Sequence, residues 1–100
     1  AGASEGNMAN IELLEVSGEG CANCFSLLPL LNKLAAERGI PLRHLEVTEE
    51  NAEEVRKYEI DRVPTVLVLK DGEVTARCSG YQPEEILSLW LDAKISDARL

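Results

Sequence analysis

The stretch of chain around Cys21 and Cys24 constrains the possible folds more than any other part of the 100-residue sequence. Before it, residues 11–16 form a short apolar run that is typical of a buried strand, and a glycine-rich loop ends this run. After it, leucines recur at helical spacing as far as Gly39, which is predicted to end a helix. The two cysteines therefore lie where a buried strand passes through a loop into a helix.

Two further elements follow this first helix. The apolar residues of the segment 42–47 predict a second strand. Thr48 is predicted to cap a second helix, because Glu49 and Glu50 would then lie in its first turn, where the helix dipole favours negative charge. We expect this helix to run to about Tyr58.

The last third of the chain predicts a hairpin followed by a helix. Residues 66–69 are β-branched or apolar, as in a central strand that is covered on both faces. Asp71-Gly72 is a strong hairpin signal, so residues 73–78 are expected to return as an antiparallel edge strand. Pro83 is predicted to occupy the first position of the final helix.

These elements predict an α/β fold of the order β-α-β-α-β-β-α in one domain over residues 8–100. The first two crossovers are long enough to be helical and to join parallel strands, whereas the third connection is a tight hairpin. A four-stranded mixed sheet sandwiched by helices is expected. Residues 1–7 are small, polar and without pattern, and we interpret them as an expression remnant.

Composition excludes several classes of function. The chain has 18 acidic and 10 basic residues, a formal net charge of −8, so neither nucleic acid nor an anionic membrane is expected as a partner. No apolar run approaches the roughly 20 residues of a membrane span. Three cysteines are too few for a disulfide-stapled secreted scaffold. We therefore expect a cytoplasmic protein whose close cysteine pair is catalytic or binds metal.

Two thiols at this spacing and position can close a disulfide reversibly. The free amides and the positive dipole end of the predicted helix favour a thiolate on Cys21. Cys21 is therefore the expected nucleophile, which forms a mixed disulfide with the substrate. Cys24, about one turn later, is expected to resolve that intermediate and release the product thiol.

The same spacing also suits half of a zinc site. Zinc normally needs four ligands, and the remaining candidates, Cys78 and His44, fall on different predicted strands without a second close pair. No metal site is therefore predicted. His44, the only histidine, is interpreted as a surface or packing residue and is assigned no role. Cys78 is interpreted as a buried inert thiol, with regulatory oxidation or dimer formation as the alternative.

Over roughly residues 11–95 the chain resembles the thioredoxin family. Pro29 follows the second cysteine by five residues, where thioredoxins carry a proline that kinks the active-site helix. Val63-Pro64-Thr65 resembles the family's Ile-Pro-Thr, whose proline is cis and lies against the disulfide. A cis proline at this position would leave the backbone of the preceding residue free to pair with an extended peptide.

Other features extend this resemblance or depart from it. Residues 70–74 resemble the family's hairpin, and Gly80 falls where the family has a glycine beside the active site. Thioredoxins usually carry Trp before the first cysteine and Gly-Pro between the two. Here Gly20 and the dipeptide Ala22-Asn23 stand in those places.

Glu15 corresponds by spacing to a buried aspartate that the family carries six residues before the first cysteine. A carboxyl group buried under the helix would exchange protons near neutral pH and accept the proton of Cys24. The alternative is an ordinary strand carboxylate that reaches solvent, and the sequence leaves the two open.

The resemblance implies a thiol-disulfide oxidoreductase that needs no organic cofactor, acts on protein disulfides as a monomer and receives electrons from a thioredoxin reductase. It also implies a shallow apolar and backbone surface that meets the partner. This surface is expected to comprise Gly20, Ala22, Ile60, Val63, Pro64 and Gly80.

Two other functions remain open at this point. In the first, the domain is a thioredoxin-fold binding module whose cysteine pair is structural or redox-inactive and whose acidic surface recruits a partner. In the second, cysteine pairs of two chains hold a metal or cluster between them. Reactivity of the thiols and metal analysis would distinguish these functions from disulfide exchange.

Overall fold

The computed structural model describes residues 10–100, so the predicted remnant at residues 1–7 and the domain start at residue 8 lie outside the described part. The observed order of elements matches the predicted one. The elements are β1 (Ile11–Ser17), α2 (Ala22–Arg38), β2 (Leu42–Glu46), α3 (Ala52–Lys57), β3 (Thr65–Lys70), β4 (Glu73–Ser79) and α4 (Glu84–Ala98).

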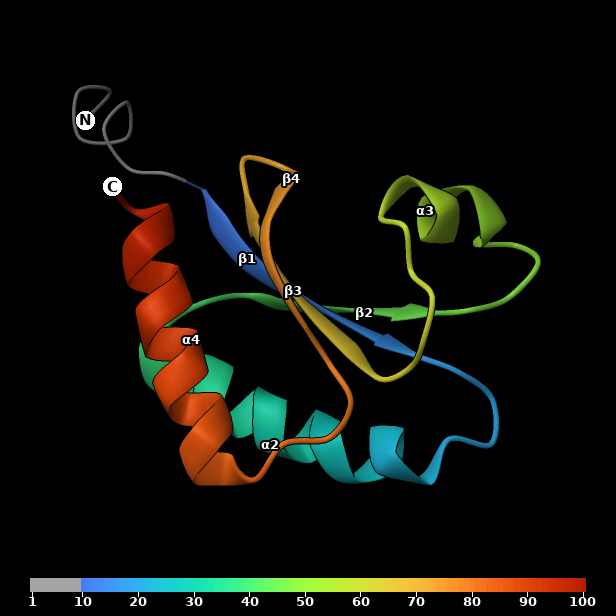
Figure 1. The fold of residues 1–100 in the computed structure, drawn as a ribbon, viewed down its shortest axis with the longest axis horizontal. Coiled ribbons are helices and arrows are strands. Elements are labelled where there is room, and N and C mark those ends of the chain that lie inside the picture. The colour runs from blue at the N-terminus through green and yellow to red at the C-terminus, as the bar shows by residue number, and fades with distance from the viewer. Residues whose placement is uncertain (1–9) are drawn as a thin grey trace.

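The strands form one four-stranded mixed sheet in the order β2-β1-β3-β4 (Figure 1). β1 pairs in parallel with β2 and antiparallel with β3, and β4 returns antiparallel to β3. The predicted mixed sheet and the edge hairpin are confirmed.

The prediction that the second crossover joins parallel strands is wrong. A parallel strand would have to start at the opposite end of the sheet, about 16 Å back along β2. Instead, α3 lies beyond the end of β2 (Figure 1), and the chain re-enters the sheet at that same end, where Thr65 of β3 pairs with Val16 of β1. This places the start of β3 beside the loop that carries the cysteines.

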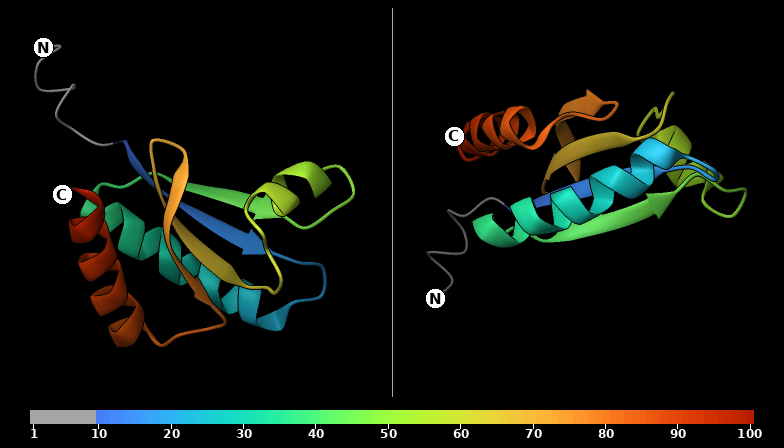
Figure 2. Two further views of the ribbon diagram at one scale, coloured as in Figure 1. Left: turned by 45° about the horizontal axis from the view of Figure 1, so that its top comes forward. Right: turned by 90° about the horizontal axis from the view of Figure 1, so that it is seen from below.

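Helices cover both faces of the sheet, as expected. α2 and α4 pack in one buried cluster with Leu13 and Val68. The other cluster contains Leu14 and Leu67, together with Tyr58 at the end of α3. Figures 1 and 2 show α3 beyond the end of β2, away from the two long helices. Because neighbouring side chains of a strand alternate between faces, Glu15 shares the α2 face with Leu13.

The second helix starts later than the sequence predicts. Thr48 caps a preceding turn, in which its hydroxyl oxygen accepts a hydrogen bond from the N–H of Asn51 at 3.3 Å. The Asn51 side chain donates to the carbonyl of Glu46 at 2.9 Å and so holds this residue outside the helix, which begins at Ala52. Its end at Lys57, with Tyr58 as the C-cap residue, agrees with the prediction.

The two long helices need smaller corrections. α2 ends as predicted at Gly39, whose left-handed φ of 64° suits glycine. α4 begins one residue later than predicted, because Pro83 is its N-cap residue in extended conformation. Among residues 10–100, no helix is long and apolar enough to cross a membrane.

Leu31→Ala is expected to lower the free energy of unfolding by about 2–5 kcal/mol, because Leu31 is fully buried between the sheet and the helices. Urea unfolding of the oxidised protein measures this loss. Leu89→Ala is the control, since Leu89 lies on the outer face of α4 with 72% of its surface exposed, and its loss should stay within about 0.5 kcal/mol. Equal losses for the two variants would contradict the assignment of this core.

Candidate active site

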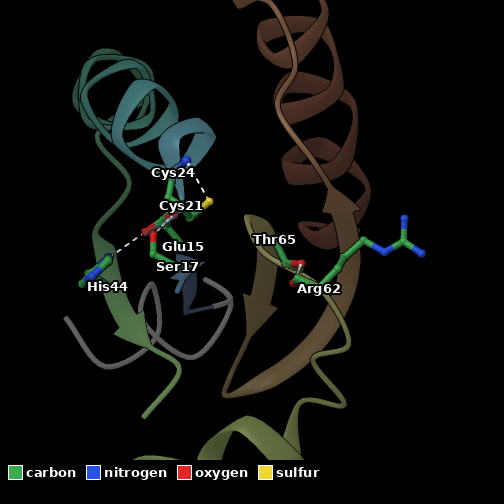
Figure 3. Close-up of a disulfide and its surroundings, with 7 residues drawn as sticks. All are labelled: Glu15, Ser17, Cys21, Cys24, His44, Arg62 and Thr65. Carbon is green, nitrogen blue, oxygen red and sulfur yellow. Dashed lines mark hydrogen bonds and ion pairs between the residues drawn. A yellow bond between two sulfur atoms is a disulfide. The ribbon is translucent and has the colours of Figure 1, made fainter. Parts of the chain in front are cut away.

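The cysteine pair lies where the sequence predicts it, at the start of α2 (Figure 3). Cys21 is the N-cap residue, and its sulfur accepts a hydrogen bond from the backbone N–H of Cys24 at 3.2 Å. A disulfide joins the two residues, whose Cα atoms are 5.3 Å apart. Cys21 is half-buried, whereas only 5% of Cys24 is exposed. A second molecule therefore reaches the sulfur of Cys21 more easily than that of Cys24.

The backbone conformation before the cysteine pair explains why residue 20 is a glycine. Its φ is +70°, a backbone conformation that other residues rarely adopt. The tight turn into Cys21 therefore suits glycine, where the family usually places Trp.

Glu15 is completely buried, so the alternative of a carboxylate that reaches solvent is excluded. Both of its carboxylate oxygens have partners (Figure 3). The hydroxyl of Ser17 donates to Oε2, and Nδ1 of His44 lies 2.6 Å from Oε1. These two neighbours therefore supply the polar contacts that a buried carboxyl group needs.

His44, which the sequence analysis interprets as a surface or packing residue without a role, is a direct partner of Glu15. Glu15 and His44 stand opposite each other in the parallel pair of β1 and β2, and their side chains meet on the α2 face. The imidazole is 39% exposed at its other side, where Nε2 lies 3.7 Å from a carboxylate oxygen of Glu46. Only the register of the two strands would have revealed this contact from the sequence.

A cavity of about 360 Å³ opens beside the disulfide. Both cysteines line it, as do Ser17 and His44, the two partners of Glu15. The cavity thus connects the surroundings of Cys24 with the groups that hold the buried carboxylate. Phe25, which follows Cys24 and is 77% exposed, also borders it, although no sequence motif pointed to this residue.

Some of the predicted partner-binding residues gather at a second cavity, of about 300 Å³. Ile60 and Val63 line it together with Gly18, where a Cβ atom would lie 3.1 Å from a methyl group of Val63. Gly18 and Glu19 line both cavities, whereas the two cysteines line only the first.

The other predicted partner-binding residues are Gly20, Ala22, Pro64 and Gly80. The peptide bond between Val63 and Pro64 is cis, as the family resemblance implies. The N–H of Gly80 donates to the carbonyl of Pro64 at 2.7 Å, so β4 is tied to this turn. Ala22 is exposed in the first turn of α2, and Gly20 lines the cysteine cavity.

Cys78 is half-buried on β4 rather than fully buried as interpreted. In the pairing of strands, Val66 lies between Cys78 and Glu15, which places the third thiol away from the disulfide. Burial raises the pKa of the Cys78 thiol. Among residues 10–100, no group of three or more His, Cys, Asp or Glu side chains is arranged to hold a metal ion.

Cys78 is expected to react with iodoacetamide several-fold more slowly in the folded protein than in 6 M urea. The raised pKa leaves less thiolate at neutral pH. The increase of the reaction rate with pH should therefore occur at a higher pH in the folded protein than in the unfolded one. Peptide mass spectrometry on the double variant C21S/C24S isolates this thiol. Equal rates in the two conditions would show that the fold does not protect it.

Comparison with known proteins agrees with this geometry. The thioredoxin family model matches residues 6–93. The chain belongs to the thioredoxin family. It is 34% identical over 86 residues to thioredoxin of Staphylococcus aureus, a match that covers 84% of this chain and 82% of the relative. It is 40% identical over 68 residues to thioredoxin of Bacillus subtilis, which covers 67% of this chain and 65% of that relative.

A solved structure supports the fold. A chain in the crystal structure of the complex of ferredoxin:thioredoxin reductase with thioredoxin f2 superimposes with a TM-score of 0.75 at 20% identity. The match covers 93% of this chain and 86% of that one. Family membership and the bonded cysteine pair together define the chain as a thiol-disulfide oxidoreductase.

Proposed function

We propose that this chain reduces protein disulfides in the cytoplasm, with Cys21 as the attacking thiol and Cys24 as the resolving thiol. The observation that carries these roles is the difference in exposure between the two cysteines. The more exposed thiolate, that of Cys21, attacks, because the disulfide of a bulky substrate must come into contact with the attacking sulfur. The buried thiol of Cys24 then attacks the mixed disulfide from within the same molecule.

The proposed cycle transfers two electrons. The Cys21 thiolate attacks one sulfur of the substrate disulfide and releases the other as a thiol. Cys24 loses its proton and attacks the Cys21 sulfur of the mixed disulfide, which frees the second substrate thiol and leaves Cys21 and Cys24 oxidised. Glu15 accepts the Cys24 proton in this scheme, because it is the buried carboxylate whose partners line the cavity beside Cys24.

The substrate is proposed to lie across the shallow surface around the pair. Its extended backbone would pair with Val63 next to the cis proline, and its apolar side chains would contact the cavity that Ile60 and Val63 line. The other contacts of this surface are proposed to come from Gly20, Ala22, Pro64 and Gly80.

A thioredoxin reductase is the proposed source of electrons, and the protein is proposed to act as a monomer. The structural neighbour in the complex of ferredoxin:thioredoxin reductase with thioredoxin f2 supports a reductase as partner. A reducing compartment keeps such a dithiol available for a further cycle.

Two measurements test the proposal. The protein is equilibrated with glutathione redox buffers, and its reduced form is then tested for reduction of a protein disulfide. We expect a single two-electron transition for the pair Cys21/Cys24 and dithiol-dependent reduction of insulin. A pair that does not exchange with glutathione, or a dithiol that leaves insulin oxidised, would instead favour the redox-inactive binding module.

A further inference from the structure

The buried carboxyl group of Glu15 has two neighbours through which a proton can leave. Both carboxylate oxygens are occupied, one by the Ser17 hydroxyl and one by the imidazole of His44. Ser17 is itself buried, with 7% of its surface exposed, whereas the His44 side chain is 39% exposed. The imidazole is therefore the better exposed of the two groups that link Glu15 to solvent.

We propose that His44 carries the proton that Glu15 receives from Cys24 out to solvent, and so sets the rate of the resolving step. This inference rests on the proposed function, in which Glu15 is the proton acceptor. Imidazole suits this task, because it takes up and releases protons between about pH 5 and 8 and has two nitrogens on opposite sides of the ring. Here one nitrogen faces the carboxylate and the other faces outward.

The proton moves in three steps. The Cys24 thiol gives its proton to Glu15 as its sulfur attacks the mixed disulfide and the substrate thiolate leaves. Oε1 of Glu15 then gives the proton to Nδ1 of His44, across the 2.6 Å contact. Nε2 releases its own proton to water, and exchange with solvent returns the ring to the tautomer protonated on Nε2. The protein ends with one disulfide and two electrons fewer.

The charged groups around the imidazole favour this route. Glu15 faces it from β1, and Glu46 of its own strand lies near Nε2 at 3.7 Å. Cys24 of α2 and Glu19 of the preceding loop line the same cavity. A transient imidazolium therefore lies between two carboxylates, which stabilise its charge. The neighbouring Arg43 belongs to the other face, where it binds Glu54 at 2.7 Å.

Ellman's reagent separates the two chemical steps. On a Cys78→Ser background, the reduced protein releases one thionitrobenzoate when Cys21 attacks and a second when Cys24 resolves the mixed disulfide. His44→Gln keeps a hydrogen-bonding partner for Glu15, but its amide cannot take up a proton and pass it on to solvent. We expect the first release to change less than twofold and the second to slow by about tenfold or more in dilute buffer.

Chemical rescue distinguishes proton transfer from a structural role. In His44→Ala, added imidazole should restore the second release in proportion to its concentration, without altering the first. Arg43→Gln, which changes the charge of the same strand on its other face, is the control and should leave both releases unchanged. A second release that His44→Gln does not slow, or that imidazole does not restore, overturns the inference.

Failure of the inference can be told apart from failure of the proposed function. If Glu15→Gln slows the second release while both His44 variants leave it unchanged, Glu15 keeps its role and the proton leaves by another path. If the parent protein gives no second release, the pair does not resolve mixed disulfides, and the proposed function fails with the inference.

Discussion

Cys21→Ser is expected to reduce the rate of protein disulfide reduction by about 10³-fold or more, while Cys24→Ser stops after the first step with the substrate still attached. The attacking group must be a thiolate, and a serine hydroxyl cannot take its place in disulfide exchange. Cys21, at the helix start, is the more exposed of the two cysteines, whereas only 5% of Cys24 is exposed. The two variants should therefore fail at different steps.

Mass spectrometry under non-reducing conditions measures the difference. Cys24→Ser, mixed with a substrate disulfide, should accumulate a covalent adduct through Cys21 that dithiothreitol releases, and Cys21→Ser should form none. Cys78→Ser is the matched control and should keep the parent rate, because this thiol lies on β4, away from the pair. If Cys21→Ser accumulated the adduct and Cys24→Ser did not, the assigned roles of the two cysteines would be reversed.

The position of the cysteine pair could be predicted because it depends on local patterns. An apolar strand, a loop with glycine and a leucine-rich helix follow one another along the chain, and each is visible within about ten residues. The structure places Cys21 at the helix N-cap and Cys24 in the first turn accordingly. Burial of Glu15 was one of two alternatives that the sequence left open, and only the packing of α2 over this face of β1 decides between them.

The contact between Glu15 and His44 could not be predicted, because it depends on the alignment of two strands that are far apart in sequence. Shifting that register by one residue would turn the imidazole to the other face of the sheet. The start of α3 was misplaced because of a local side-chain contact. The side chain of Asn51 binds the carbonyl of Glu46, a contact that competes with helix formation.

Glu15→Gln is expected to slow the resolving step by about 10²-fold and to leave the attack by Cys21 within twofold of the parent rate. The amide keeps hydrogen-bonding partners for Ser17 and His44 but cannot accept a proton from Cys24. Since the buried charge is removed without a loss of volume, the free energy of unfolding should stay the same or rise by about 1 kcal/mol. The variant therefore separates catalysis from stability.

Glu12→Gln is the matched control for this variant. Glu12 is a carboxylate of the same strand three residues earlier, but it pairs opposite Leu69 and lies on the face away from α2. Both thionitrobenzoate releases should keep their parent rates in Glu12→Gln, whereas only the second should slow in Glu15→Gln. Equal slowing of both releases in Glu15→Gln would mean that the carboxylate acts on the reactivity of Cys21 rather than on the Cys24 proton. No slowing at all would mean that Cys24 loses its proton directly to water in the cavity, and the carboxylate would then be retained for structure alone.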